Sequence, residues 1–389
     1  MNSTKGNFAH KSVVNDSICL TWSSKLKKLY HFGPILALSS IFLLFFLSSL
    51  VLVRCLPPDK SFLGMIHFAY TIMEVYYMIS SYFFAVFTGP GFVPLKWRPP
   101  NLKDEEHLVF CESCQGYKPP RAHHCRACGR CVLKMDHHCP WLNTCCGHLN
   151  HGYFMHFVIT ATISSTHGFL ANGSCVVLHL FAVSSFRTFL SKNTCDFRFQ
   201  IYSKADYLRP YIVFTRVETY FILFNTAFAL AISISVGILT ITQLRFISKN
   251  ETGIETYIKS SALCRTRDPN EEPFIFPYDL GDADTNLLQV MSFSGQTVGD
   301  GYEWPIKEGA NKFAIIIEQE AQRDSCRKSK RPVLITEEYG GFMFPFCQTG
   351  PTAVICGSPW CDSRRLAIYP GEVVIVSKWN KSVYVSFLQ

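Results

Sequence analysis

The stretch Asp136-His137-His138-Cys139 places a carboxylate, two imidazoles and a thiol within four residues. A carboxylate can fix the tautomer of a histidine, and the histidine can accept the proton of a thiol and stabilise the thiolate. A thiolate held in this way is a nucleophile. The stretch therefore predicts nucleophilic catalysis, unless all of these side chains serve metal binding or hydrogen bonding, an alternative that local chemistry leaves open.

Metal binding competes for these side chains, because residues 111–146 contain eight cysteines and four histidines. A Cys-x-x-Cys pair, such as Cys111–Cys114 or Cys125–Cys128, spans two corners of a tetrahedral structural zinc site and needs two further ligands. Two zinc ions would use eight of these twelve candidates and leave four over. A third zinc is arithmetically possible, but it would need the convergence of His123, His137, Cys139 and Cys146.

The composition of residues 111–146 also predicts that this segment needs zinc in order to fold. The segment has few aliphatic residues, and a small domain without an apolar core depends on metal or disulfide staples. The chain holds 17 cysteines, and the densest of them form Cys-x-x-Cys spacings, which indicate metal or redox work in a reducing compartment. If one zinc binds His138, the adjacent His137 must face elsewhere and becomes available for catalysis.

The overall composition predicts a membrane protein. Hydrophobic residues make up 48% of the chain and charged residues only 17%, and the mean hydropathy is +0.13. Soluble domains carry about a quarter charged residues. The net charge of +8 is spread along the chain, so it favours contact with an anionic lipid surface or anionic substrate over nucleic-acid binding.

Four stretches are long and apolar enough to cross the roughly 30 Å hydrocarbon core of a bilayer as helices. These stretches are residues 33–53, 62–87, 153–186 and 221–242. Four spans put the basic loop at 88–152 on the same side as both termini, and the positive-inside rule places that side in the cytosol. Glu74, inside the second span, is either a functional group or the partner of a polar neighbour.

The position of Cys139 favours the catalytic alternative. The cysteine lies shortly before the third span, in a loop tethered to membrane helices at both ends. A thiolate there would act at the cytosolic face of the bilayer, where it suits a substrate with an apolar tail and an activated head. A fatty acyl-CoA has this form: its tail would enter the helices, with about 0.8 kcal/mol for each buried CH₂ group, and its thioester would meet Cys139.

The full spacing resembles a known family. The pattern is Cys111-x2-Cys114-x9-His124-Cys125-x2-Cys128-x2-Cys131-x4-Asp136-His137-His138-Cys139-x5-Cys145. It is similar to the cysteine-rich domain of the DHHC-type protein S-acyltransferases (palmitoyltransferases), and the similarity extends over roughly residues 25–290. The segments GPGFVP (89–94) and GDGYEWPIKEG (299–309), with DHHCPW, resemble the sixth mammalian type, which carries a Src-homology-3-like domain near its C-terminus.

This resemblance implies a role for each side chain. One zinc would bind Cys111, Cys114, His124 and Cys131, and the other would bind Cys125, Cys128, His138 and Cys145. Cys139 would accept the acyl group from palmitoyl-CoA and pass it to a cysteine of a substrate protein, with His137 as base and Asp136 as its orienting partner. The residues implied to contact the acyl-CoA are Lys118, Arg121 and His123 near its phosphates and Trp141 at the acyl entrance.

Three motifs depart from the family. Its Asp-Pro-Gly is Gly89-Pro90-Gly91 here, its Thr-Thr-x-Glu is Thr252-Gly253-Ile254-Glu255, and its Asn-Asn is Asn143-Thr144. Asn286 matches the asparagine of the family's C-terminal motif. None of the departures affects the proposed nucleophile, base or zinc ligands.

We expect an α-helical integral membrane protein with four transmembrane helices and a cytosolic double-zinc domain built of small β-hairpins. Its expected parts are a cytosolic N-terminus (1–32), helices 1 and 2 (33–87), the cysteine-rich domain (88–152), helices 3 and 4 (153–243), a C-terminal motif region (244–310) and a Src-homology-3-like region (311–389). The alternating pattern of residues 366–385 predicts short strands of a small β-barrel. The barrel is expected to be incomplete, because the sequence ends at Gln389.

The resemblance also implies substrate proteins with membrane-proximal cysteines and a location in the endoplasmic reticulum, with the Golgi as the alternative endomembrane. It leaves the oligomeric state open. Two other functions share the motif: a membrane adaptor whose zinc loop binds protein or lipid, and a thioesterase-like hydrolase. Four C-terminal cysteines are either ordinary thiols or acylation sites: Cys326, Cys347, Cys356 and Cys361.

Overall fold

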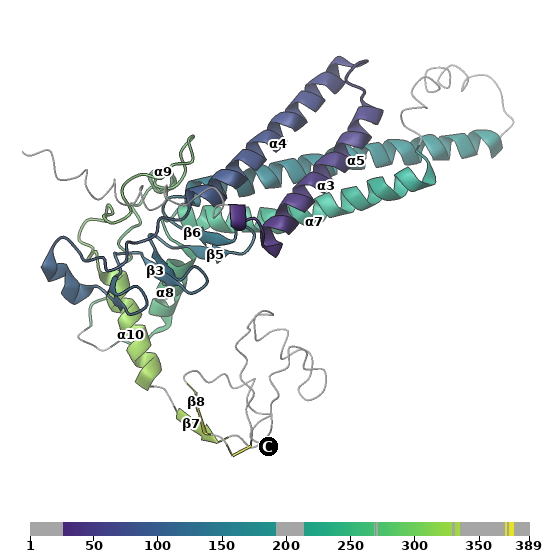
Figure 1. Ribbon diagram of the computed structural model, residues 1–389. Coiled ribbons are helices and arrows are strands. Elements are labelled where there is room, and N and C mark those ends of the chain that lie inside the picture. The colour runs from purple at the N-terminus through teal and green to yellow at the C-terminus, as the bar shows by residue number, and fades with distance from the viewer. Residues whose placement is uncertain are drawn as a thin grey trace, which may run out of the picture. The chain divides into compact units, whose positions relative to one another are not determined.

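The computed structural model describes residues 26–191, 214–267, 269, 271–328, 331–334, 370–371 and 373–376 (Figure 1). Its described parts form two compact units, one made of residues up to Ser260 together with Pro273–Ile316, and the other of Ser261–Glu272 with the chain from Ile317 onward. The first unit holds the long helices and the cysteine-rich segment.

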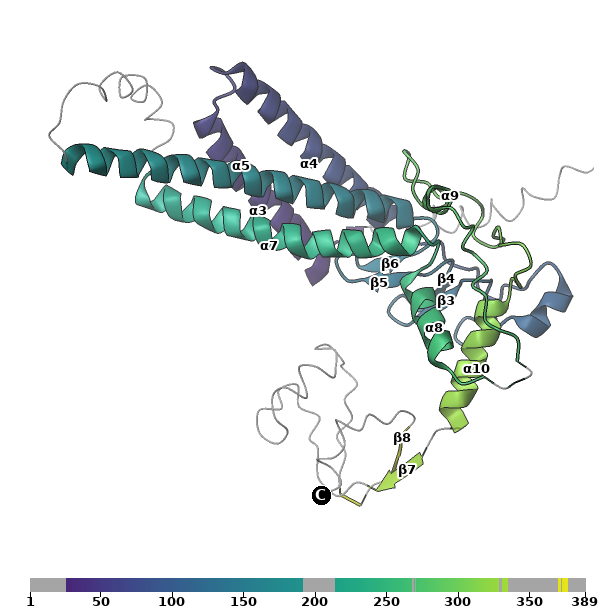
Figure 2. The same cartoon turned by 180° about the vertical axis from the view of Figure 1, so that it is seen from behind.

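Long apolar stretches form the helices of the first unit. These helices are α3 (Phe32–Cys55), α4 (Phe62–Thr88), α5 (His151–Ser191) and α7 (Arg216–Ile247). Helix α5 packs along α7 and α4, and α3 contacts the other three, as both views of the bundle show (Figures 1 and 2). Helix α4 begins at the capping side chain of Ser61 and ends at Gly89, whose φ of 77° suits glycine.

Among the described residues, three helices are long and apolar enough to cross a membrane: α3, α4 and α7. The predicted third span lies inside α5, whose hydroxyl side chains form hydrogen bonds with α7. The hydroxyl of Thr162 lies 3.0 Å from that of Thr240, and Thr166 lies 2.6 Å from Ser233. Hydrogen bonds of this kind connect helices inside a membrane, where water cannot replace them.

Glu74 of α4 has the polar neighbour that its sequence context suggested as one alternative. Its buried carboxylate lies 2.8 Å from Nδ1 of His167 on α5, and the ring of His67 packs against His167. Ionisable groups at this depth face the bundle interior and pair with one another. The pair thus fixes α4 against α5.

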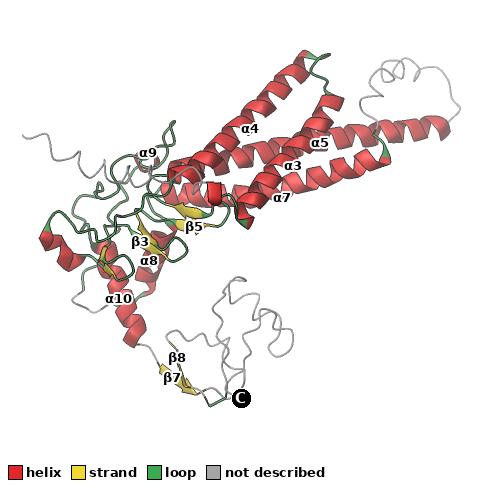
Figure 3. Cartoon of the chain, in the orientation of Figure 1, coloured by secondary structure: helices red, strands yellow, loops and turns green. Residues whose placement is uncertain are grey.

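Three short antiparallel hairpins form the cysteine-rich segment, as predicted (Figure 3). They pair β1 (Phe110–Cys111) with β2 (Gly116–Tyr117), β3 (His123–Cys125) with β4 (Arg130–Val132), and β5 (His137–Cys139) with β6 (Thr144–Cys146). A 3₁₀ turn, η1 (Leu102–His107), precedes them. Cysteines make up half of the ten buried residues in the two hydrophobic clusters of this segment.

Beyond α7 the chain returns to the cysteine-rich segment. Helix α8 (Gly253–Cys264) starts beside it, and α9 (Ala283–Leu288) follows. Asn286 of α9 donates hydrogen bonds to Ser248 O at 3.0 Å and to Asp279 Oδ1 at 2.8 Å, which closes the loop between α7 and α9.

The C-terminal region begins differently from the expected barrel. Residues Ala314–Lys328 form helix α10, because this stretch is rich in alanine, glutamate, glutamine and arginine, which favour helices. Strand β7 (Arg331–Leu334) then pairs with β8 (Val373–Val376). Strand β8 falls within the stretch predicted to form strands. The remainder of the expected barrel, with Cys347, Cys356 and Cys361, lies outside the described residues, as does the side chain of Cys326.

Candidate active site

The β5–β6 hairpin separates its side chains by strand alternation. Facing residues in an antiparallel pair point to the same side, and successive residues point to opposite sides. His138 faces Cys145, so these two share one side of the hairpin. His137 faces Cys146 and Cys139 faces Thr144, so these four share the other side. One side can therefore bind metal while the other is free for chemistry.

The first side completes a group of four metal ligands with Cys125 and Cys128. Nδ1 of His138 lies 3.6 Å from Sγ of Cys125, 3.4 Å from Cys128 and 3.6 Å from Cys145. Zinc bonds of about 2.3 Å to sulfur and 2.0–2.1 Å to nitrogen would put tetrahedral ligands roughly 3.6 Å apart. The side chains present therefore fit a zinc ion.

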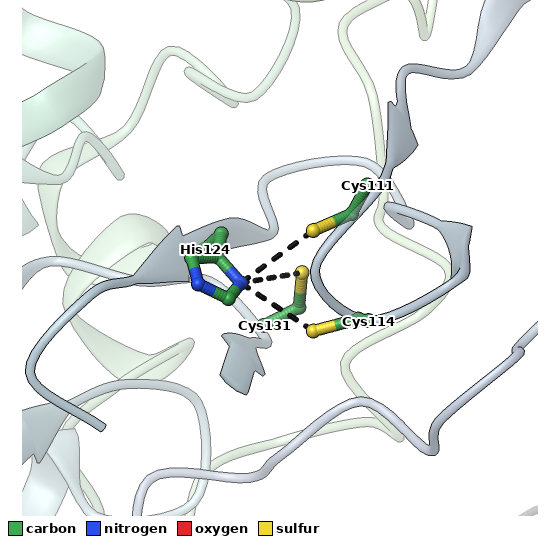
Figure 4. Close-up of side chains that lie close together, drawn as sticks. All are labelled: Cys111, Cys114, His124 and Cys131. Carbon is green, nitrogen blue, oxygen red and sulfur yellow. Dashed lines mark hydrogen bonds between the residues drawn. The ribbon is translucent and has the colours of Figure 1, made fainter. Parts of the chain in front are cut away.

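A second group has the same geometry (Figure 4). Nδ1 of His124 lies 3.5 Å from Sγ of Cys111, 3.4 Å from Cys114 and 3.8 Å from Cys131. The ligand atoms of each group all lie within 4.8 Å of one another. Both groups match the ligand sets that the family resemblance implied, and the chain can hold two metal ions.

The β3–β4 hairpin explains why the two groups interleave along the chain. His124 faces Cys131 across the hairpin, so both point to the first metal group. Cys125, the next residue, points to the opposite side and joins the second group. One hairpin thus contributes to both groups and braces the segment in two directions.

His137, on the non-metal side of β5–β6, lies between the other two predicted catalytic residues, Asp136 and Cys139. Nδ1 of His137 lies 2.6 Å from Oδ2 of Asp136, which leaves Nε2 for the hydrogen bond with Cys139. Burial alone would lower the pKa of His137, but its bonds to Asp136 and Cys139 outweigh burial and raise this pKa to about 10. A hydrogen bond from Cys146, opposed by burial and reinforced by His137, lowers the pKa of Cys139 to about 5. The site therefore favours a thiolate–imidazolium pair at neutral pH.

Asp136 is held by groups far away in the sequence. Its Oδ2 accepts a hydrogen bond from Gln243 Nε2 at 3.0 Å, and its Oδ1 accepts one from the backbone N–H of Gly253, at the start of α8. Burial opposes ionisation of the carboxyl group, but the bond from His137 and these surroundings hold the pKa of Asp136 well below its usual range. A helix N-terminus favours negative charge in the same way.

An apolar cavity of about 570 Å³ opens beside these residues and runs between α3, α4, α5 and α7. His137, Cys139 and Trp141 line it together with helix side chains. Trp141 is half exposed, and its carbonyl accepts a hydrogen bond from the hydroxyl of Tyr82 at 3.0 Å. This position is compatible with the predicted role of Trp141 at an acyl entrance.

The predicted contact of Arg121 with coenzyme A does not fit the structure. Its guanidinium is fully buried, donates to both carboxylate oxygens of Glu255 at 2.7 Å, and lies over the rings of Tyr278 and Trp304. A side chain so enclosed cannot reach a phosphate at the surface. Arg121 instead joins the cysteine-rich segment to α8.

Lys118 and His123 remain partly exposed on the cysteine-rich segment. Other contributors carry no sequence signal that identifies them. Gln243 is one polar residue at the end of an apolar helix, and Asn250 and Lys134 are separated by 116 positions, although Lys134 Nζ donates to Asn250 Oδ1 at 3.0 Å. Their roles depend on contacts that only the folded chain creates.

The fold and the site define a class of protein: a membrane protein with a cysteine–histidine–aspartate group at the mouth of an apolar cavity, braced by two cysteine–histidine metal groups. Known proteins are similar to this chain in sequence. The family model described as DHHC palmitoyltransferase matches residues 104–260. Palmitoyltransferase ZDHHC6 of Danio rerio is 35% identical over 358 residues, which cover 92% of this chain and 85% of that protein.

The human ZDHHC6 is 35% identical over 355 residues, covering 91% of this chain and 84% of that protein. Palmitoyltransferase PFA4 of Yarrowia lipolytica is 32% identical over 231 residues, covering 57% of this chain and 59% of that protein. The chain therefore belongs to the DHHC palmitoyltransferase family, which confirms the predicted resemblance, and it is an acyltransferase that S-palmitoylates proteins.

Proposed function

We propose that this protein acylates cysteines of other proteins through a covalent acyl intermediate on Cys139. The observation that carries this assignment is that Cys139 and His137 lie on the same side of the β5–β6 hairpin and line the same apolar cavity. A nucleophile is thus adjacent to a proton acceptor and to space for a long alkyl chain. Zinc, when bound, supplies structure, because both groups have four protein ligands and no open position.

In the first step, the Cys139 thiolate attacks the carbonyl carbon of a fatty acyl-CoA. The bond between that carbon and the sulfur of coenzyme A breaks, and the departing sulfur takes the proton from His137. The products are free coenzyme A, a thioester on Cys139 and a neutral imidazole. Asp136 keeps Nδ1 of His137 protonated throughout, so Nε2 is always the atom that exchanges the proton.

In the second step, the neutral imidazole accepts the proton of the substrate protein's cysteine. The new thiolate attacks the thioester, and Cys139 leaves as a thiolate beside the reprotonated His137. The starting ion pair is restored without any other reactant. An incoming cysteine near the membrane surface would meet the thioester most readily, which favours membrane-proximal acceptor cysteines.

The cavity contributes more by positioning the acyl chain than by increasing the affinity for it. An acyl chain arriving from the bilayer exchanges one apolar environment for another, so burial between the helices adds little free energy. Holding the thioester carbonyl next to Cys139 supplies the advantage, because a reaction between groups held together avoids the entropy of a bimolecular encounter. Trp141 and Pro140 line the mouth where this carbonyl would lie.

We further propose that α5 is the fourth span, which places the site at the cytosolic face of an endomembrane. The endoplasmic reticulum is the favoured compartment, from the similarity to ZDHHC6, and the Golgi is the alternative. Palmitoyl-CoA would be the co-substrate, and Lys118 and His123 are the remaining candidates for contacts with its phosphates.

The test uses the purified full-length protein and palmitoyl-CoA labelled in its acyl chain. We expect a hydroxylamine-sensitive label on the protein that is lost in Cys139→Ala and retained in Cys264→Ala, since Cys264 is an exposed cysteine outside the motif. A label that survives Cys139→Ala would contradict the assignment. Release of free palmitate without transfer to a cysteine-containing acceptor would indicate a hydrolase, and no label on the wild-type chain would indicate an adaptor.

A further inference from the structure

Cys146 is a buried cysteine that neither metal group uses. The cysteines of residues 111–146 divide between the two groups, except for Cys139 and Cys146. Cys146 follows directly after a metal ligand, Cys145, but strand alternation turns it to the opposite side of the hairpin. Its side chain has no exposed surface.

Each of the three proposed catalytic residues contacts Cys146. It faces His137 across the hairpin, and its carbonyl accepts the backbone N–H of Asp136 at 3.0 Å. Its side chain shares one side of the hairpin with that of Cys139, and both cysteines belong to the same buried cluster. The proposed nucleophile therefore shares this side of the hairpin with an imidazole and a second thiol.

We propose that Cys146 is a positioning residue of the acyl transfer, whose S–H group donates to Sγ of Cys139 and keeps this sulfur on the His137 side of the hairpin. The inference rests on the proposed role of Cys139 as nucleophile. A thiol is a weak donor, but a charged acceptor strengthens the bond. Cys146 itself is fully buried, so its S–H group faces the protein interior.

The geometry of Cys139 and Cys146 suits a hydrogen bond between their sulfurs and not a disulfide. Cys139 and Cys146 occupy diagonal positions of an antiparallel pair, where α-carbons lie roughly 7–8 Å apart. A disulfide requires about 4.4–6.8 Å between α-carbons. The backbone would have to move to close that gap, and the adjacent residues His138 and Cys145 hold the hairpin to a metal group. The two sulfurs thus remain a donor and an acceptor.

The hydrogen bond has its largest effect in the second chemical step. A thiolate is a strong acceptor, whereas the sulfur of a thioester is a poor one. Formation of the acyl intermediate therefore weakens the bond, and departure of Cys139 as a thiolate restores it. Cys146 stabilises the leaving group in transfer to the acceptor, and leaving thiolates that are stabilised depart faster.

Two matched pairs of variants test this role. Cys146→Ser and Cys146→Thr keep a hydroxyl donor, whereas Cys146→Ala and Cys146→Val remove it at similar size. The full-length protein is first acylated with labelled palmitoyl-CoA, free CoA compounds are removed, and an acceptor peptide containing a cysteine is added. The measured quantity is the rate at which label leaves the protein in a single turnover.

We expect the donor variant of each pair to discharge about tenfold faster than its apolar partner, the effect of a hydrogen bond of ordinary strength. A side chain that only packed would give the reverse order in the second pair, because valine suits an apolar cluster better than threonine. Equal rates within both pairs, or a faster Val variant, would overturn the proposal. Either pair suffices if the other fails to fold, which zinc content and thermal unfolding reveal. Loss of labelling in Cys139→Ala but not in these variants separates this test from that of the proposed function.

Discussion

Arg121 and Glu255 form an ion pair with both side chains fully buried, although 134 positions separate them in the chain. Asn250 adds two acceptors for the same guanidinium, its Oδ1 at 3.2 Å and its carbonyl oxygen at 2.6 Å. Glu255 also accepts the N–H of Thr252 at 3.0 Å, so it caps the helix whose next N–H, from Gly253, binds Asp136. The ion pair therefore connects the cysteine-rich segment to the backbone group that holds the proposed catalytic carboxylate.

Removing one residue of the Arg121–Glu255 pair should destabilise the folded protein. We expect Glu255→Ala to reduce the free energy of unfolding by about 3–5 kcal/mol, because the guanidinium is left charged, buried and unpaired. Acylation activity should fall with it, since α8 loses its anchor. Thermal and denaturant unfolding of the purified protein measure the first effect, and labelling with palmitoyl-CoA measures the second.

The matched control is Arg98→Ala, which removes an exposed partner of Glu105. Surface pairs of this kind contribute about 0–1 kcal/mol. If Glu255→Ala were no more destabilising than Arg98→Ala, the buried pair would not be the connection described here.

The Asp136→Asn variant tests the role of Asp136 in orienting His137 while it keeps the contact of residue 136 with Gly253. The amide can still accept from the N–H of Gly253, but its NH₂ group cannot accept from Nδ1 of His137, so the imidazole loses its charge partner and its fixed tautomer. We expect acylation to fall by about 10²–10⁴-fold, the range for loss of general acid–base function. Single-turnover labelling at pH 7 measures this change. Zinc content should remain at the wild-type value, and substantial labelling would show that His137 does not need the carboxylate.

The two metal groups predict a stoichiometry. We expect two zinc ions per purified chain, measured by elemental analysis, and about one in Cys128→Ala together with a large loss of thermal stability, since metal binding and folding are coupled. Cys139→Ala should retain both ions, because Cys139 lies on the other side of the hairpin from His138. Loss of zinc from Cys139→Ala would make this cysteine a ligand and remove it from catalysis.

A structural feature can be predicted from the sequence when the contacts that determine it are between residues close together in the chain. The spacing within 111–146 predicts two metal groups, and the family resemblance supplied the division of their ligands, which strand alternation in the hairpins explains. The apolar stretches also predict their helices, except that the hydroxyl-rich α5 falls short as a span when judged by composition. In each of these cases the signal lies in neighbouring residues.

Contacts between residues far apart in the chain could not be predicted from the sequence. Arg121 is an arginine in a basic loop, and nothing near it indicates that Glu255 will bury its charge; the predicted surface role was the natural expectation and was wrong for this reason. Gln243 likewise reaches Asp136 across 107 positions. The side of the hairpin on which Cys146 lies could have been derived from alternation, once His138 and Cys145 were paired.

The reactivity of Cys139 should show an unusual dependence on pH. Its pKa is lowered to about 5, first by the hydrogen bond from Cys146 and then by His137, and the pKa of His137 is raised to about 10 by Asp136 and Cys139 against the effect of burial. Between these values the thiolate and the imidazolium coexist. We expect the rate of alkylation of Cys139 by iodoacetamide to be nearly constant from about pH 6 to pH 9 and to fall below pH 5, where the thiolate gains a proton.

Acylation needs a further condition, because coenzyme A must receive the proton of His137. Its rate should therefore rise through about pH 5 as Cys139 ionises and decline as pH approaches about 10, where His137 loses its proton. In His137→Gln the imidazolium is absent, so the pKa of Cys139 should move up toward the ordinary thiol value of about 8.5 and the alkylation rate at pH 6 should drop sharply. Alkylation of the Cys264→Ala protein, followed by mass spectrometry of the peptide containing Cys139, isolates this thiol. A wild-type profile with its midpoint near pH 8.5 would show that the thiol is not activated by its neighbours.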